Sequence, residues 1–281
     1  MQSLHHVPAP AKLNLFLHVT GKRADGYHLL QSVFMLVDWW DVLHFERRDD
    51  GQLLREDLSL PLPADDLCLR AARALKVASG TSLGAVIHID KRLPAQAGLG
   101  GGSSNAATCL LALNRLWGLD WPLSRLLPIA LTLGADVPFF VRGHNAWVQG
   151  IGEDLQPLAL PQAHFAILKP LQGLETAHIF RDPALKRDTS PATISCFAAQ
   201  PYAFGRNDLQ AVAQRLCPEV AQALKWFEYQ GFKARMTGSG SAVFALVSPQ
   251  TVLPKPPPGW QLQMCSNLEV HPLAGWASCD D

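Results

Sequence analysis

The sequence predicts an α+β protein with two domains, and three observations support this prediction. Its 281 residues suit one large domain or two ordinary ones, and two is the better expectation. Stretches with strand periodicity and stretches with helical periodicity follow one another along the chain. A glycine-containing turn at 150–154, followed by two prolines, indicates a boundary. We therefore expect domains at 1–158 and 159–281, and leave open whether the tail packs back on the first domain.

The charge balance and the apolar pattern exclude several classes of protein. Hydrophobic residues form 48% of the chain and charged residues 17%, which indicates packed cores rather than disorder. Lysine plus arginine equals aspartate plus glutamate at 24 each, so no overall field attracts nucleic acid or an anionic membrane. The apolar runs are short, and the N-terminus lacks the features of a signal peptide. We expect a cytoplasmic protein that is a monomer or a weak homodimer.

The first half begins with two strands. Alternating apolar residues from Ala11 onward predict a strand in which Lys12 and Asn14 share one face. A lysine in this position is more often a solvated edge charge than a catalytic group. A polar turn then ends in Tyr27 and His28, which are either core and cap residues or the wall of a ligand pocket. The apolar run at 32–40 predicts the second strand.

Helices and short strands complete the first half. Asp65 or Asp66 caps the first predicted helix. Gly134 ends the last one, and Asp136 follows it within an apolar run. A carboxylate is expensive to bury there unless it is paired, so Asp136 is either a turn residue or functional. The predicted elements are a small sheet extension at 41–63, helices at 66–76, 104–117 and 123–133, and a strand at 85–89.

The second half repeats this mixture of strands and helices. An irregular stretch that contains Thr176 and Phe180 follows its first strand, and residues 237–241 form a second glycine turn, which alone reads as a plain hairpin loop. The six cysteines are scattered and give no metal-ligand spacing, so we expect reduced thiols and assign no metal ligand. The predicted strands lie at 165–168, 232–236, 242–247 and after residue 259, and the predicted helices at 207–216 and 219–229.

A glycine-rich loop at 94–107 joins the strand at 85–89 to the helix that follows. Its glycines allow positive φ and let a ligand approach the backbone amides closely. Ser103, Ser104 or Asn105 is expected to cap the helix, whose free N–H groups and positive dipole end would then face the loop. Such a loop is suited to phosphate, although a flexible turn is the simpler alternative.

The loop fits neither of the common nucleotide motifs. No Gly-Lys-Ser/Thr follows the glycines, which excludes the usual NTPase loop with its lysine. Ser103 stands where the dinucleotide pattern requires its third glycine, and the acidic residue expected about twenty positions later is missing. A third kind of phosphate loop is needed, in which a hydroxyl-rich helix start replaces the lysine.

Three segments together resemble the GHMP kinase superfamily. They are Pro-Ala-Lys-Leu-Asn-Leu at 10–15, Gly-Leu-Gly-Gly-Gly-Ser-Ser-Asn-Ala-Ala at 98–107, and Gly-Ser-Gly-Ser-Ala-Val-Phe at 238–244. The resemblance implies a two-domain GHMP-kinase fold, with an N-terminal domain like domain 2 of ribosomal protein S5 and a ferredoxin-like C-terminal domain. It also implies that ATP and Mg²⁺ are the cofactors. The implied ATP-phosphate contacts are Pro94, Ala95, Gln96, Ala97, Gly98, Leu99, Gly100, Gly101, Gly102, Ser103 and Ser104.

The resemblance also implies catalytic and substrate-binding residues. Asp136 would accept the proton of a substrate hydroxyl, and Lys12 would be its charged partner. Further matching segments at 21–28, 134–140 and 150–153 point to a cytidine diphosphate-linked methylerythritol as the substrate, phosphorylated on its 2-hydroxyl for non-mevalonate isoprenoid precursor synthesis. Tyr27 and Phe180 would clamp the base, His28 would hydrogen-bond it, and Asn14 would lie near the methylerythritol.

Two alternatives stay open. A GHMP kinase for another small alcohol is one, although such a substrate has no use for an aromatic clamp. A non-catalytic binding module is the other, and the joint presence of Lys12 and Asp136 weakens it. The resemblance leads us to expect asparagine where this chain has Asp66, and an ionised carboxylate cannot donate the hydrogen bond that an asparagine amide would offer to adenine.

Overall fold

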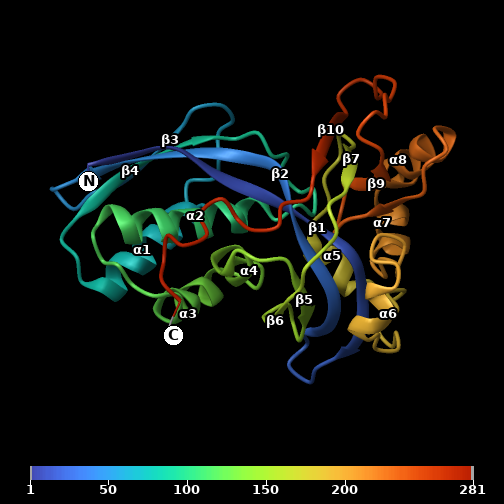
Figure 1. Ribbon diagram of the computed structural model, residues 1–281, viewed down its shortest axis with the longest axis horizontal. Coiled ribbons are helices and arrows are strands. Elements are labelled where there is room, and N and C mark those ends of the chain that lie inside the picture. Colours follow the sequence, from blue (N-terminus) through green and yellow to red (C-terminus); the bar gives the residue numbers. More distant parts are fainter. Residues whose placement is uncertain (1, 280–281) are drawn as a thin grey trace.

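A six-stranded sheet forms the first half of the molecule in the computed structural model, which describes residues 2–279 (Figure 1). The strand order is β3-β4-β2-β5-β6, and β1 pairs antiparallel with β2. Residues 9–19 of β1 are buried on both faces, so the predicted alternation does not separate a core face from a solvent face. The strands are β1 (Ser3–Lys22), β2 (His28–Arg48), β3 (Leu53–Asp57), β4 (Gly84–Asp90), β5 (Ala146–Gln149) and β6 (Asp154–Pro157).

Four helices cover one face of this sheet: α1 (Leu67–Ser79), α2 (Gly101–Leu116), α3 (Leu123–Leu133) and α4 (Val137–Arg142) (Figure 1). Helix α2 is buried along nearly its whole length between the sheet and the other helices. Asp66 caps α1 as predicted, because its side chain accepts a hydrogen bond from the backbone N–H of Leu69. The predicted bounds of α3 are also confirmed.

The predicted cap of α2 is wrong. The helix begins three residues earlier than expected, and its N-cap is Gly100 with φ of 71°. A glycine adopts this left-handed conformation without steric penalty, so it turns the chain into the helix where a serine or asparagine was expected. Ser103 and Ser104 consequently lie in the first helical turn rather than before it.

The second half is a four-stranded antiparallel sheet with the order β10-β7-β9-β8. The helices α5 and α6 were not predicted, because segments of six and five residues are too short to show helical periodicity. The strands are β7 (His164–Lys169), β8 (Ala234–Met236), β9 (Val243–Val247) and β10 (Gln261–Ser266), and the helices are α5 (Thr176–Arg181), α6 (Ile194–Ala198), α7 (Gln210–Leu216) and α8 (Pro218–Tyr229).

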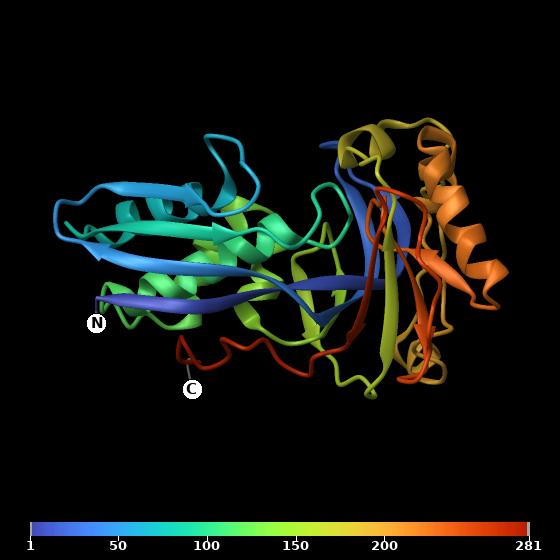
Figure 2. The ribbon, with the colours of Figure 1, turned by 90° about the horizontal axis from the view of Figure 1, so that it is seen from above.

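Two connections hold the halves together. Strand β1 extends into the second half, where the Arg235 guanidinium donates to the carbonyl of Leu15 and the Asp208 carboxylate accepts from the N–H of Val19. The C-terminal segment 267–279 returns to the helices of the first half, as the red trace in Figures 1 and 2 shows. There the N–H of Leu123 donates to the carbonyl of Ser278.

Within residues 2–279, no helix is both long and apolar enough to cross a membrane.

Candidate active site

A cavity of about 770 Å³ lies where strand β1, the glycine loop and the second glycine turn meet. Both halves of the molecule contribute to its wall, which places it between the two sheets. Of the residues that the sequence suggested as site residues, the cavity is lined by Lys12, Asn14, Pro94, Ala95, Gln96, Ala97, Gly98, Leu99, Gly100, Gly101, Gly102, Ser103, Asp136 and Phe180.

The glycine loop is held against the second glycine turn. A Cβ atom at Gly98, where φ is 73°, would lie 2.2 Å from the carbonyl oxygen of Thr237. The N–H of Ser241 donates to the carbonyl of Gln96 at 3.1 Å, and the N–H of Lys12 donates to that of Leu99 at 2.9 Å. The loop thus leads into the start of α2 with its first N–H groups free for an anion.

Lys12 and Asp136 meet at the side of this loop. Lys12 Nζ lies 3.4 Å from Asp136 Oδ2. The Lys12 side chain is 5% exposed, whereas the Asp136 side chain is 32% exposed and lines the cavity. Lys12 Nζ also lies 4.4 Å from the centroid of the Phe34 ring. The pair therefore presents a carboxylate to the cavity with a cation behind it.

A buried hydrogen-bond network orients Lys12. Its Nζ donates to Asn14 Oδ1, and Asn14 Nδ2 donates to Ser32 Oγ at 2.9 Å. The backbone N–H of Asn14 donates to Thr237 Oγ1 at 3.0 Å. Sequence reasoning missed Ser32 and Thr237, because a lone hydroxyl on a strand or in a turn gives no pattern. The sequence did predict that Lys12 and Asn14 share one face of a strand, and this was the only part of the network that could be predicted.

The expected base-binding residues are only partly brought together. Phe180 lines the cavity and its ring centroid lies 5.0 Å from that of His28, whereas Tyr27 is 60% exposed. Burial lowers the pKa of His28, and the nearby cations Arg187 and Lys22 lower it further. His28 and Tyr27 lie outside the cavity wall formed by the described residues.

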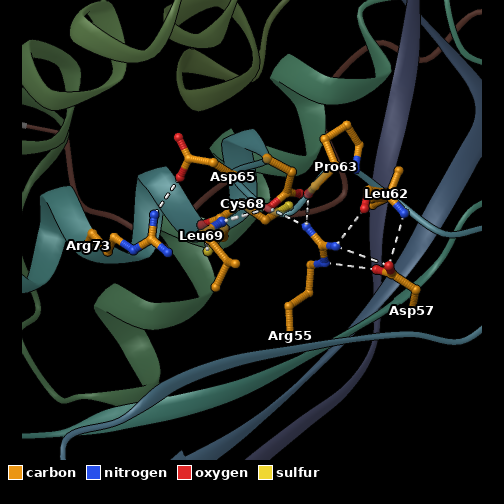
Figure 3. A network of polar contacts seen from close by, with 10 residues as sticks. Arg55, Asp57, Leu62, Pro63, Asp65, Cys68, Leu69 and Arg73 are labelled. Atoms are coloured by element: carbon orange, nitrogen blue, oxygen red, sulfur yellow. Dashed lines mark hydrogen bonds and ion pairs between the residues drawn. The ribbon is translucent and has the colours of Figure 1, made fainter.

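The far end of the cavity is lined by Leu62, Pro63, Asp65 and Asp66. Figure 3 shows how a polar network shapes this wall. The Arg55 guanidinium lies 2.9 Å from Asp66 Oδ1 and donates to the carbonyl of Pro63 at 2.7 Å. Asp66 is thus engaged by Arg55 and by the backbone N–H of Leu69, which gives this carboxylate a structural role at the start of α1.

Two family models match the chain: the GHMP kinases N-terminal domain at residues 66–144 and the GHMP kinases C-terminal domain at 193–253. A curated relative, 4-diphosphocytidyl-2-C-methyl-D-erythritol kinase of Albidiferax ferrireducens, is 62% identical over 280 residues, which span 100% of this chain and 98% of the relative. The chain belongs to the GHMP kinase family. The enzyme of the same name from Paracidovorax citrulli is 60% identical to this GHMP kinase over 100% of both chains.

Solved structures support the same conclusion. A crystal structure of 4-(cytidine 5'-diphospho)-2C-methyl-D-erythritol kinase matches this GHMP kinase with 37% identity and a TM-score of 0.75, over 86% of this chain and 89% of that one. Homoserine kinase from Cytophaga hutchinsonii matches with a TM-score of 0.68 at 16% identity, over 96% of both chains, which shows the fold alone. The predicted two-domain GHMP-kinase fold is confirmed.

Proposed function

We propose that this protein is an ATP-dependent kinase that phosphorylates the 2-hydroxyl of 4-diphosphocytidyl-2-C-methyl-D-erythritol, in non-mevalonate isoprenoid precursor synthesis. The observation that carries the proposal is the Lys12–Asp136 pair, 3.4 Å apart at the side of the glycine loop in one cavity. The relatives named as kinases of this substrate, at about 60% identity over the whole chain, support the choice of substrate.

The residue types fit phosphoryl transfer. This reaction needs positioning and charge neutralisation more than a strong base, so a carboxylate that takes the hydroxyl proton late in the step is sufficient. Asp136 is exposed enough to reach the substrate, and Lys12 stabilises negative charge on the entering oxygen. The free N–H groups at the start of α2 hold the phosphates of ATP.

Mg²⁺ accompanies ATP in this proposal, and the residues near the loop fit it in part. The Ser104 hydroxyl and Asn105 Oδ1 are buried with no hydrogen-bond partner among residues 2–279. No three His, Cys, Asp or Glu side chains of the same residues are grouped to hold a metal ion. We therefore assign Mg²⁺ mainly to the phosphates, with the Ser103 or Ser104 hydroxyl as a protein ligand. Held there, the ion would supply positive charge that offsets the negative charge of the transferring phosphate group.

The cytidine end of the substrate is assigned to the cavity edge at Phe180 and His28. Stacking on an aromatic ring contributes about 1–3 kcal/mol per base. Tyr27, exposed at the tip of the same hairpin as His28, supplies the second ring when substrate is bound. Asn14 lies beside Lys12 and is assigned to the methylerythritol end.

The cellular setting follows from the substrates. ATP and a cytidine diphosphate-linked alcohol are cytoplasmic metabolites, so we place the enzyme in the cytoplasm. We expect a monomer or weak homodimer that needs neither nucleic acid nor a membrane. Light scattering with and without substrate tests the oligomeric state.

The deciding experiment supplies the purified protein with Mg-ATP and the cytidylated substrate and follows ADP release. Substrate-dependent ADP release, with phosphate found on the 2-hydroxyl, supports the proposal. Release with mevalonate or homoserine instead would indicate a GHMP kinase for another alcohol. Tight binding of substrate without turnover would indicate a binding module.

A further inference from the structure

The guanidinium of Arg187 joins both sides of the proposed base site. Its Nε donates to Nε2 of His28 at 3.0 Å, across the boundary between the two halves. Its Nη2 donates to the carbonyls of Phe180 at 3.1 Å and Asp182 at 2.7 Å, and its Nη1 to that of Leu185 at 2.9 Å. One side chain thus holds the last turn of α5, which carries Phe180, against the hairpin that carries His28.

This contact determines which nitrogen of His28 carries the proton. A guanidinium has five donors and cannot accept a hydrogen bond, so Nε2 of His28 must be the acceptor. The neutral ring then carries its proton on Nδ1. A second ring proton would place an N–H against the Arg187 donor, and Lys22, which pairs with His28 across strands β1 and β2, adds another cation. All three causes, burial first, act to keep His28 neutral.

We propose that Arg187 is a positioning residue for the cytosine base: it holds His28 as a neutral ring whose only donor is Nδ1–H, beside the Phe180 ring. N3 and O2 of cytosine are acceptors, so a single fixed donor suits this base edge. The proposal rests on the proposed substrate. Arg187, from the second half of the chain, would thus act on the base through His28 without contacting the base itself.

Arg187 also has a structural role, because the carbonyls it binds belong to the end of a short helix and the residues after it. The test must therefore separate positioning from folding. Arg215 provides a matched control, since its guanidinium pairs with the carboxylate of Asp182 in the same segment. Arg187→Met removes the bond to His28, and Arg187→Lys keeps a cationic N–H donor at this position. Arg215→Met loosens the segment while leaving the Arg187–His28 contact in place.

Binding is measured by calorimetry with CDP and ADP as probes, and turnover with the full substrate. We expect Arg187→Met to weaken CDP binding and raise KM for the cytidylated substrate by about tenfold, with kcat and ADP affinity within about twofold. Arg187→Lys should recover part of the loss, and Arg215→Met should behave as wild type. Equal losses of CDP affinity in Arg187→Met and Arg215→Met would overturn the proposal.

Nitrogen-15 NMR of the histidine rings tests the tautomer without substrate. We expect His28 of the free wild-type protein to carry its proton on Nδ1. In Arg187→Met, the tautomer equilibrium of the His28 ring should shift toward the Nε2–H form, which predominates in free histidine. A wild-type ring protonated on Nε2 would overturn the inference, even if the kinase were fully active. The wild-type protein could also show the Nδ1–H form and yet neither bind CDP nor turn over the substrate. That outcome would overturn the proposed function and, with it, the role of Arg187 at the base.

Discussion

Asp136 Oδ2 lies 3.4 Å from Lys12 Nζ, although the two residues belong to distant segments, the first strand and the start of helix α4. Both residues line the cavity, but the lysine side chain is almost fully buried and that of the aspartate is about one-third exposed, so the carboxylate is the more accessible of the two groups. This asymmetry suits a pair in which Asp136 contacts the substrate hydroxyl and Lys12 acts from behind.

Replacing Asp136 with asparagine removes the proton acceptor while preserving the side-chain shape. We expect kcat to fall by at least about 100-fold with little change in ATP affinity, as for the loss of a general base. Steady-state kinetics and nucleotide titration measure both quantities. Asp120→Asn, at an exposed position outside the helices and strands, is the matched control. A near-wild-type rate in Asp136→Asn would make this carboxylate a structural residue.

Lys12→Met tests the other member of the pair and separates it from the first. It should lower kcat by at least about tenfold, because a charge that stabilises the entering oxygen is lost. It should also destabilise the protein by about 1–3 kcal/mol, since the buried Asn14 Oδ1 loses its donor. Asp136→Asn should leave the melting temperature nearly unchanged. Equal melting temperatures in both variants would contradict the network described for Lys12.

Gly98→Ala tests the contact between the two glycine turns. Its Cβ would lie 2.2 Å from the carbonyl oxygen of Thr237, so the loop must move. We expect a destabilisation of about 2–3 kcal/mol and a higher KM for ATP. Gly80→Ala has a similar positive φ of 67°, with no neighbouring atom of the described residues within 4 Å of the new Cβ. It should cost only about 1 kcal/mol and leave KM unchanged. An unaltered KM in Gly98→Ala would argue against the phosphate assignment.

His271 gives the stability of the fold a pH dependence. Its Nδ1 accepts from the N–H of Leu273, and its Nε2 is buried with no partner within residues 2–279. Burial lowers the pKa of His271 from 6.5 to about 3. The unfolded chain therefore binds an extra proton between these values, so the stabilisation is complete above pH 6.5 and is lost progressively as the pH falls toward 3.

Thermal unfolding of wild type and His271→Gln between pH 7 and pH 4 measures this effect. The melting temperature of the wild type should fall more steeply on acidification than that of the variant, which has no titrating group at this position. His178→Gln, at an exposed histidine, should follow the wild type. Parallel curves for wild type and His271→Gln would show that His271 does not titrate as proposed.

Several parts of the fold were predictable because their causes are local. Asp66 precedes an apolar helical pattern and caps it, and Gly134 ends α3. The glycine loop was recognised from its composition alone, and its role as a phosphate site stays a prediction. The cap of α2 was predicted incorrectly, because local preference favours a serine or asparagine there. In the fold, Gly100 has positive φ, and a Cβ atom at this position would lie 2.9 Å from the Phe140 ring.

The candidate site depends on contacts between residues that are far apart in the sequence. Strand periodicity placed Lys12 beside Asn14, but it says nothing of Ser32, Thr237 or Arg187, which reach these residues only after the strands pair and the two halves meet.

The sequence by itself determined the class of fold and the place of the glycine loop before a helix, since these depend on periodicity and glycine content within short windows. Only the tertiary structure decided that Lys12 meets Asp136, that Asp66 is engaged by Arg55, and that Arg187 holds His28. These are interactions of charges and hydrogen bonds across space, and their strength depends on distance and burial that no local pattern contains.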